Sequence, residues 1–146
     1  MKIRKVLSIV ALFALVSFGQ ADKRDQIKQL KSARIAAALN LSAAESQKFW
    51  PLYLNSEERE YEIRHNKIRP VTNKIDEKGI DALSQKEALQ YLVTLESAED
   101  EIVNLRKKLI YDLKPVIGTK KILKLRKAED DFTKLLMSKY SKSKKD

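Results

Sequence analysis

The chain contains no cysteine, and only three glycines and three prolines occur among its 146 residues. Without cysteine it has no disulfide bond, no thiolate metal site and no cysteine nucleophile. The scarcity of turn-forming residues argues against an all-β sandwich. A single histidine, His65, leaves no second imidazole for a metal site or a catalytic triad, and no grouped glycines form a phosphate loop. We therefore expect a protein that is not an enzyme and uses no cofactor or metal.

The residues that are abundant are those that favour helices. Hydrophobic residues make up 43% of the chain and charged residues 34%. This balance is typical of a folded domain and unlike that of a disordered chain or a multi-span membrane protein. The composition predicts an all-α protein, and the length fits one domain.

The first 21 residues have the pattern of a secretory signal peptide. Three basic residues among the first five precede an apolar run over residues 6–18, and small residues follow. The run is short for a membrane span, which needs about 20 residues. The pattern predicts cleavage after Gly19 or Ala21 and export to the periplasm, with an uncleaved anchor as the alternative.

The predicted cleavage also changes the meaning of the net charge. The formal charge is +10, but the signal peptide carries three basic and no acidic residues. The remaining chain has 27 basic and 20 acidic residues and a net charge of +7. Because an exported protein does not meet chromosomal DNA, we expect no nucleic-acid partner.

Hydrophobic spacing and capping signals predict one helical domain over residues 22–140 without any sheet. Four helices are expected, at 22–39, 43–69, 85–113 and 120–140. Pro51 predicts a bend near residues 40–47, and Pro70 is expected to end the second helix. Pro115 and Gly118 are expected to separate the last two helices. The basic end, residues 141–146, is expected to be a disordered tail.

Two of these helices begin with the same pattern. Leu41-Ser42-Ala43-Ala44-Glu45 and Leu83-Ser84-Gln85-Lys86-Glu87 each place a glutamate three residues after a serine. In such a capping box the serine side chain accepts from a free amide of the first turn, and the glutamate reaches back to the serine amide. Capping boxes are common, so the repeat alone does not define a family.

The context of the two boxes resembles the Spy/CpxP family of small exported helical proteins, whose paired motif is Leu-Thr-x-x-Gln. Serine and glutamate replace threonine and glutamine here. The stretches RIAAALNLSAAESQKFWPLY (34–53) and KKILKLRKAEDDFTKLLMSKY (120–140) resemble a Bacteroidetes-type branch often labelled a sensor of ECF-type sigma factor. The residues that carry the resemblance are Leu41, Ser42, Glu45, Phe49, Trp50, Pro51, Tyr53, Leu83, Ser84 and Glu87.

The resemblance implies bent antiparallel helices that form a hairpin-like, curved cradle, often as a homodimer. It also implies a periplasmic role in binding unfolded envelope proteins without ATP. The alternative is a regulatory sensor of envelope stress that binds a membrane sensor or an anti-sigma factor. A passive, envelope-spacing protein is a third class. The aromatic cluster of Phe49, Trp50 and Tyr53 is expected to pack the turn between the first two helices.

Six charged residues fall on the predicted apolar faces of the helices. They are Arg34, Glu57, Arg64, Glu99, Arg106 and Glu129. Charged groups are rarely buried unless they are paired, which suggests an interhelical ion-pair layer that fixes the register of the helices. The alternative is that a thin cradle has no deep interior and these side chains line a wet groove.

Four lysines align on the opposite face of the last predicted helix: Lys120, Lys124, Lys127 and Lys134. This face could attract an acidic partner protein of the envelope, an unfolded client or an anionic membrane surface. The alternative is an ordinary solvated face.

Overall fold

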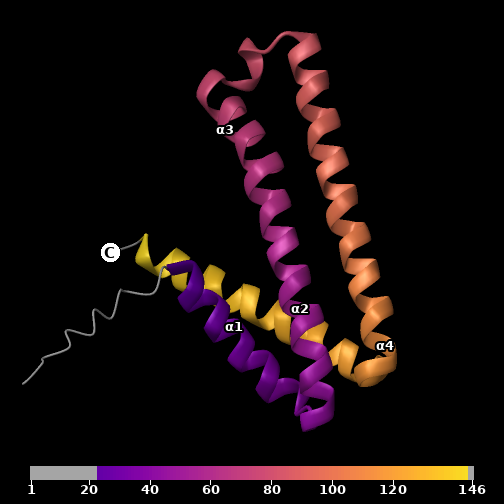
Figure 1. The fold of residues 1–146 in the computed structure, drawn as a ribbon. Helices are drawn as coiled ribbons and strands as arrows, with labels where there is room; N and C mark the ends of the chain where they lie inside the picture. The colour runs from indigo at the N-terminus through magenta and orange to yellow at the C-terminus, as the bar shows by residue number, and fades with distance from the viewer. Residues whose placement is uncertain (1–22, 145–146) are drawn as a thin grey trace, which may run out of the picture.

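The computed structural model describes residues 23–144, and within them the chain is all-helical (Figure 1). The elements in chain order are α1 (Lys23–Leu39), α2 (Ala43–Ile63), the π-helical turn η1 (Arg64–Ile68), α3 (Arg69–Lys78), the 3₁₀ turn η2 (Ile80–Ala82) and α4 (Gln85–Ser143). The predicted signal peptide lies outside the described residues.

A short turn at residues 40–42 separates α1 from α2. Asn40 has a positive φ of 44°, and its N–H donates to the Ala36 carbonyl at 3.1 Å, which closes the last turn of α1. Ser42 then caps α2 through its bonds with Glu45. The chain therefore turns where the bend was expected, but the cause is Asn40 rather than Pro51, which lies inside α2 without ending it.

Pro70 does not end the second helix, contrary to the prediction, and the expected loop from Pro70 is helical as far as Lys78. The π turn η1 precedes the proline, and the Arg69 N–H donates to the Arg64 carbonyl five residues back. In a regular helix the proline ring would meet the carbonyl of Asn66. The wider π turn makes room for the ring, so α2, η1 and α3 form one long rod.

The rod and the beginning of α4 form an antiparallel two-helix arm, which Figure 1 shows rising from the rest of the molecule. We use this name for residues 64–105. Its tip is a tight connection in which Gly79 has a φ of 80°, and the second capping box, Ser84 with Glu87, starts α4. Val71 and Ala98 are the two buried side chains of the arm, so it contains little hydrophobic core.

The third and fourth predicted helices are one element, α4, which bends sharply at Gly118. The described residues thus contain three long helical segments rather than four. Pro115 lies inside the helix, and Gly118 alone is non-helical, with φ 74° and ψ 164°. We call residues 85–117 the first limb of α4 and residues 119–143 the second limb. Figure 1 shows the second limb turning back beside α1 and α2.

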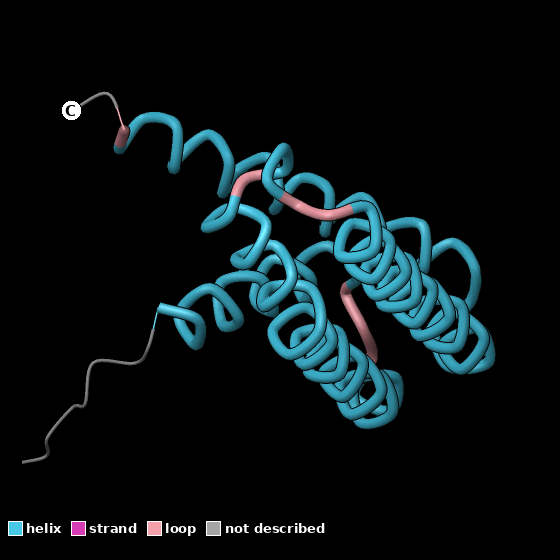
Figure 2. The backbone as a smooth tube through the Cα atoms, turned by 90° about the horizontal axis from the view of Figure 1, so that it is seen from above, coloured by secondary structure: helices cyan, strands magenta, loops and turns pink. Residues whose placement is uncertain are grey.

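The hydrophobic core lies in the base of the molecule, where α1, α2 and both limbs of α4 meet. Figure 2 shows the backbone from above, with the helices joined by short loops. Ile35 and Leu39 of α1 pack with Phe49 and Tyr53 of α2. The first limb adds Leu109, Leu113 and Ile117, and the second limb adds Ile122 and Leu125. The bend at Gly118 is what allows one helix to contribute to this core from two directions.

The end of α4 corrects one further expectation. Residues 141–143, expected in a disordered tail, are the last residues of the helix. The hydroxyls of Ser141 and Ser143 donate to the carbonyls of Ser138 and Tyr140, at 3.0 Å and 3.2 Å. The Tyr140 carbonyl is one of the last four of the helix, which lack an intrahelical partner, so the Ser143 hydroxyl supplies one.

Candidate functional site

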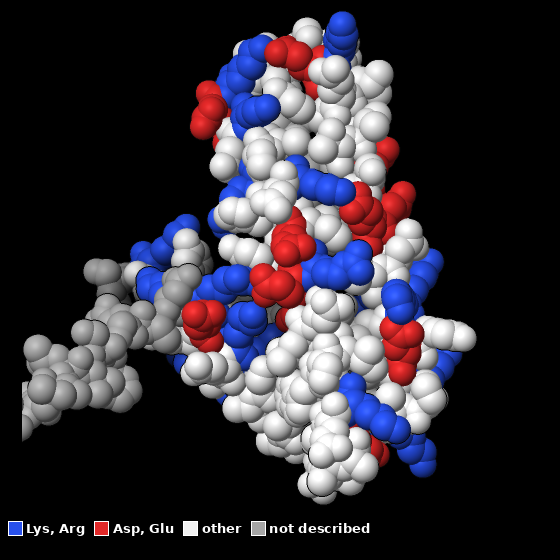
Figure 3. Space-filling view, viewed as in Figure 1, with Lys and Arg blue, Asp and Glu red and all other residues white. Residues whose placement is uncertain are grey.

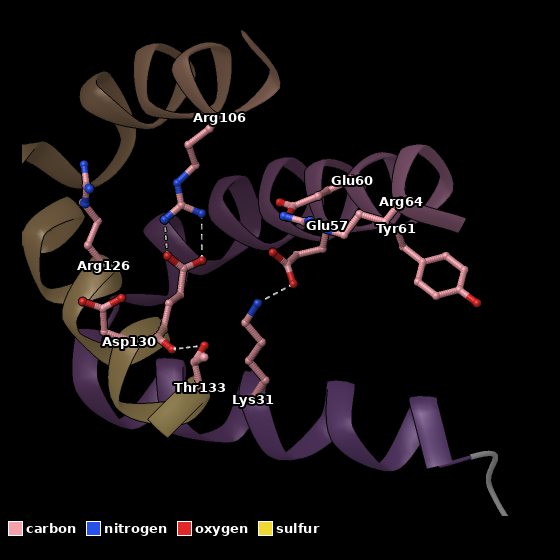
Figure 4. A pocket seen from close by; sticks show the side chains of 10 residues that line it. Lys31, Glu57, Glu60, Tyr61, Arg64, Arg106, Arg126, Asp130 and Thr133 are labelled. Carbon is pink, nitrogen blue, oxygen red and sulfur yellow. Dashed lines mark hydrogen bonds and ion pairs between the residues drawn. The ribbon is translucent and has the colours of Figure 1, made fainter. Parts of the chain in front are cut away.

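A charged pocket of about 360 Å³ opens where the arm meets the base. Figure 4 shows side chains from α1, α2 and both limbs of α4 converging on it, and Figure 3 shows acidic and basic groups gathered at this junction. Its charged lining residues are Lys31, Glu57, Glu60, Arg64, Arg106, Arg126, Glu129 and Asp130. Four of these are basic and four are acidic, so their formal charges cancel.

The innermost ion pair joins the two limbs of α4. Both terminal nitrogens of the Arg106 guanidinium, Nη1 and Nη2, donate to the Glu129 carboxylate, with Nη1 3.0 Å from Oε1. The side chain of Glu129 is only 12% exposed. The carboxylate holds the pKa of Arg106 above its ordinary value. This bidentate arrangement fixes orientation as well as distance.

Tyr53 of α2 adds a third element to the same cluster. Its hydroxyl donates to Glu129 Oε1 at 3.0 Å, and its ring is buried in the core. Burial, together with the nearby carboxylates of Glu57 and Glu129, raises the pKa of the phenol well above its ordinary range. The hydroxyl therefore remains a proton donor throughout the physiological pH range.

A second set of ion pairs joins α1 to α2. Lys31 Nζ lies 2.6 Å from Glu57 Oε2, while Arg24 and Lys28 both contact Glu58, at 2.8 Å and 3.1 Å. Arg24 also stacks on the ring of Tyr61, with 3.4 Å from its central carbon to the ring centre. These basic residues follow each other at helical spacing on α1. This spacing is visible in the sequence and could have indicated a charged face that pairs with α2, but a search for apolar positions alone does not detect it.

The structure brings together only part of the predicted ion-pair layer. Arg106 and Glu129 pair with each other, and Glu57 pairs with Lys31. Arg34 and Glu99 are exposed, and Arg64 is exposed and pairs with Glu60 of its own helix at 2.7 Å. The expected pairing was wrong for Arg34 and Glu99 because the buried faces of their helices were misplaced. Arg64 instead lines the open charged pocket with Glu57, Arg106 and Glu129, which agrees with the alternative of a wet groove. The buried face of α1 carries Ile35 and Leu39, while Ile27 and Leu30 are exposed.

The predicted structural motif is divided between the core and the surface. Phe49 and Tyr53 are buried and their rings stack with centres 5.4 Å apart. Half-buried Trp50 meets Phe49 edge-on at 4.9 Å, while Pro51 is exposed. Leu41 packs against the core and Leu83 is half-buried at the tip of the arm. The cluster thus packs the junction that follows the first turn.

Both capping boxes are present, and each glutamate has a lysine partner as well. The Ser42 and Ser84 amides donate to Glu45 and Glu87 at 2.9 Å in both boxes. Lys121 lies 2.7 Å from Glu45, and Lys78 lies 2.8 Å from Glu87. Lys78 and the Ser84 amide lower the pKa of Glu87 to about 2, and Lys121 with the Ser42 amide lowers that of Glu45.

Exposed aliphatic side chains lie along one side of α4 in the arm. The sequence did not predict this exposed apolar surface. Leu89, Leu92 and Val93 are 60%, 52% and 55% exposed, and Val103 follows further along the helix. A shallow hollow of about 550 Å³ lies beside them, lined in part by Val71 and Tyr91. We call Leu89, Leu92 and Val93 the arm patch. Leu92 and Val103 are exposed because the other helix of the arm covers a different face of α4.

The four predicted partner-binding lysines all lie on the exposed side of the second limb. Lys127 pairs with Asp131 at 2.9 Å, one turn away on the same helix, and Leu123 is an exposed aliphatic residue among them. This basic face is separate from the arm patch, because the two lie on different limbs of α4. A partner attracted by the lysines would therefore contact the second limb, in the base of the molecule, rather than the arm.

The described residues define two kinds of surface, the arm patch and the basic face. Within residues 23–144 no group of three or more histidine, cysteine or acidic side chains is arranged to hold a metal ion. None of the helices in that range is long and apolar enough to cross a membrane. Comparison of the chain with family models, with curated proteins and with solved structures gave no match.

Proposed function

We propose that this protein is a periplasmic, non-enzymatic binding protein of the Spy/CpxP type that holds partly unfolded envelope proteins without using ATP. The observation that carries the proposal is the arm patch. Three large aliphatic side chains, each more than half exposed, lie on an arm with little core of its own. Contiguous exposed apolar surface of this kind is typical of binding sites.

The surroundings of the patch favour brief and adaptable binding. Glu96, Glu99 and Asp100 follow it on the same side of α4, so a client meets apolar and charged groups together. Lys67 and Glu101 pair across the arm at 2.5 Å, and Lys78 with Glu87 near its tip. Exposed ion pairs contribute little stability, which leaves the arm free to adjust to different clients.

An aggregation-suppression assay tests this proposal. The protein is mixed at equimolar ratio with several unrelated clients as they unfold, at two salt concentrations. We expect wild-type protein to suppress aggregation, and Leu89→Ser/Leu92→Ser/Val93→Ser to lose most of the effect. The matched control is Leu123→Ser/Met137→Ser, which removes equally exposed apolar groups from the second limb. No suppression of any client by the wild type would refute the proposal.

The basic face supports a second candidate, a regulatory protein that binds a membrane sensor or an anti-sigma factor and releases it under stress. Lys120, Lys124 and Lys134 lie on one exposed side of the second limb. Such a partner would bind with salt-dependent affinity. Lys120→Glu/Lys124→Glu should then abolish capture of a single envelope protein, whereas the arm-patch variant should not. Deletion of the gene should also change the expression of a defined set of genes.

A further inference from the structure

The bend in α4 depends on the backbone of one residue. Gly118 has φ 74° and ψ 164°, a combination that is essentially restricted to glycine. A methyl group built on Gly118 would meet nothing within 4 Å. Packing therefore does not demand a glycine here. Its backbone freedom is the property that the bend requires.

The second limb is held in place by contacts that do not depend on the bend. Ile122 and Leu125 pack into the core with Ile35 and Phe49, and Lys121 pairs with Glu45 of α2. Arg106 of the first limb pairs with Glu129. All of these contacts would be equally satisfied by the second limb of another copy of the chain.

We propose that the groove between α1, α2 and the first limb accepts the second limb of a second copy, and that Gly118 is the residue that keeps each second limb in the groove of its own chain. With helical dihedral angles at residue 118, α4 would be one continuous helix, because Pro115 already lies inside it. Its second limb would leave its own groove. Two such chains would exchange limbs symmetrically and remake every core contact and ion pair between them.

Gly118→Ala tests the proposal directly. Alanine disfavours the bent conformation and favours a continuous helix. In each exchanged dimer, residue 118 of both chains is helical and no longer has to adopt the bent conformation. We expect the dissociation constant of the dimer to fall by at least about 30-fold. Light scattering of the full chain across a range of concentrations measures this change. A Gly118→Ala protein that remains monomeric at every concentration would overturn the proposal.

Gly79→Ala is the matched control. Gly79 has a similar conformation, with φ 80° and ψ 141°, and equally open space for a methyl group. It lies at the tip of the arm, where η2 and the extended residues Leu83 and Ser84 also separate α3 from α4. One changed residue cannot make those helices continuous, so this variant should lose stability without forming a dimer.

Isotope mixing distinguishes limb exchange from any other dimer. Unlabelled and ¹⁵N-labelled Gly118→Ala chains are unfolded, mixed equally and refolded together. A zero-length carbodiimide cross-linker then joins Glu45 to Lys121, whose charged atoms are 2.7 Å apart. Limb exchange predicts that about half of the cross-linked peptide pairs carry one label each, because chains pair at random. A dimer whose Glu45–Lys121 pairs never mix labels would contradict the proposal.

The wild-type chain provides the test if Gly118→Ala fails to fold. Refolded from a mixture of labels at high protein concentration, it should give a small fraction of mixed Glu45–Lys121 pairs. That fraction should rise with protein concentration, since exchange is bimolecular. The absence of mixed pairs at the highest concentration would overturn the proposal.

Discussion

The Arg106 guanidinium and the Glu129 carboxylate bind each other across the bend in α4, although 23 residues separate them in the chain. Tyr53 of α2 donates to the same carboxylate. Three helical segments are thereby joined at one acidic group at the edge of the hydrophobic core. The bend places the carboxylate there, and the guanidinium and hydroxyl compensate for its partial removal from water.

Removal of the Tyr53 hydroxyl tests the contribution of this hydrogen bond. We expect Tyr53→Phe to lower the free energy of unfolding by about 1–2 kcal/mol, because a half-buried carboxylate loses one donor while Arg106 remains. Urea unfolding measures the change. Tyr111→Phe is the control, since Tyr111 is exposed and its substitution should change stability by less than about 0.5 kcal/mol. Equal effects in the two variants would contradict the assignment.

Glu129→Gln tests the charge of the cluster. Glutamine retains an acceptor for Tyr53 but leaves Arg106 without its counter-charge. We expect a loss of about 1–3 kcal/mol, between the values typical of exposed and fully buried pairs. Asp131→Asn, which breaks the exposed pair with Lys127, should cost about 0.5 kcal/mol or less. A loss for Glu129→Gln no larger than that for Asp131→Asn would show that the cluster behaves as a wet surface pair.

The two capping serines should matter equally at the two helix starts. Ser42→Ala and Ser84→Ala each remove the acceptor for a first-turn amide, and each should cost about 1 kcal/mol. Ser97→Ala is the control, because it lies at an exposed position inside α4 where alanine is the better helix former. Thermal unfolding of the three variants should therefore give two lowered melting temperatures and one unchanged or slightly raised.

The lowered pKa of Glu87 predicts how stability changes with pH. A carboxyl group whose pKa falls from 4.5 to about 2 on folding stabilises the fold above pH 4.5, and this stabilisation is lost as the pH falls towards 2. Glu87→Gln should thus have a lower melting temperature than wild type at pH 7, and the difference should vanish near pH 2. Glu96→Gln, exposed on the same helix, is the control. A difference between wild type and Glu87→Gln that stays constant from pH 7 to pH 2 would show that Glu87 contributes no pH-dependent stability.

Local patterns in the sequence were enough to predict the helical starts and the all-α class. A capping box joins residues three apart, so its geometry depends on the local chain. The aromatic cluster was placed correctly beside the first turn for a related reason, since Phe49, Trp50 and Tyr53 follow one another at helical spacing on α2. The breaks were predicted less well. Pro70 is accommodated by a π turn, and Gly118 bends α4 rather than ending it.

The sequence by itself determined where helices form, because helix propensity, capping and turn residues act over three or four positions. The tertiary structure alone decided which face of each helix is buried. Leu92 and Val103 lie at helical spacing on α4 and yet are exposed, whereas Ala98 and Leu109 are buried, because a helix buries the face that a neighbour covers. The tertiary structure also decided which charged residues pair. Lys31 contacts Glu57, and Arg106 contacts Glu129, only after the chain has turned back on itself.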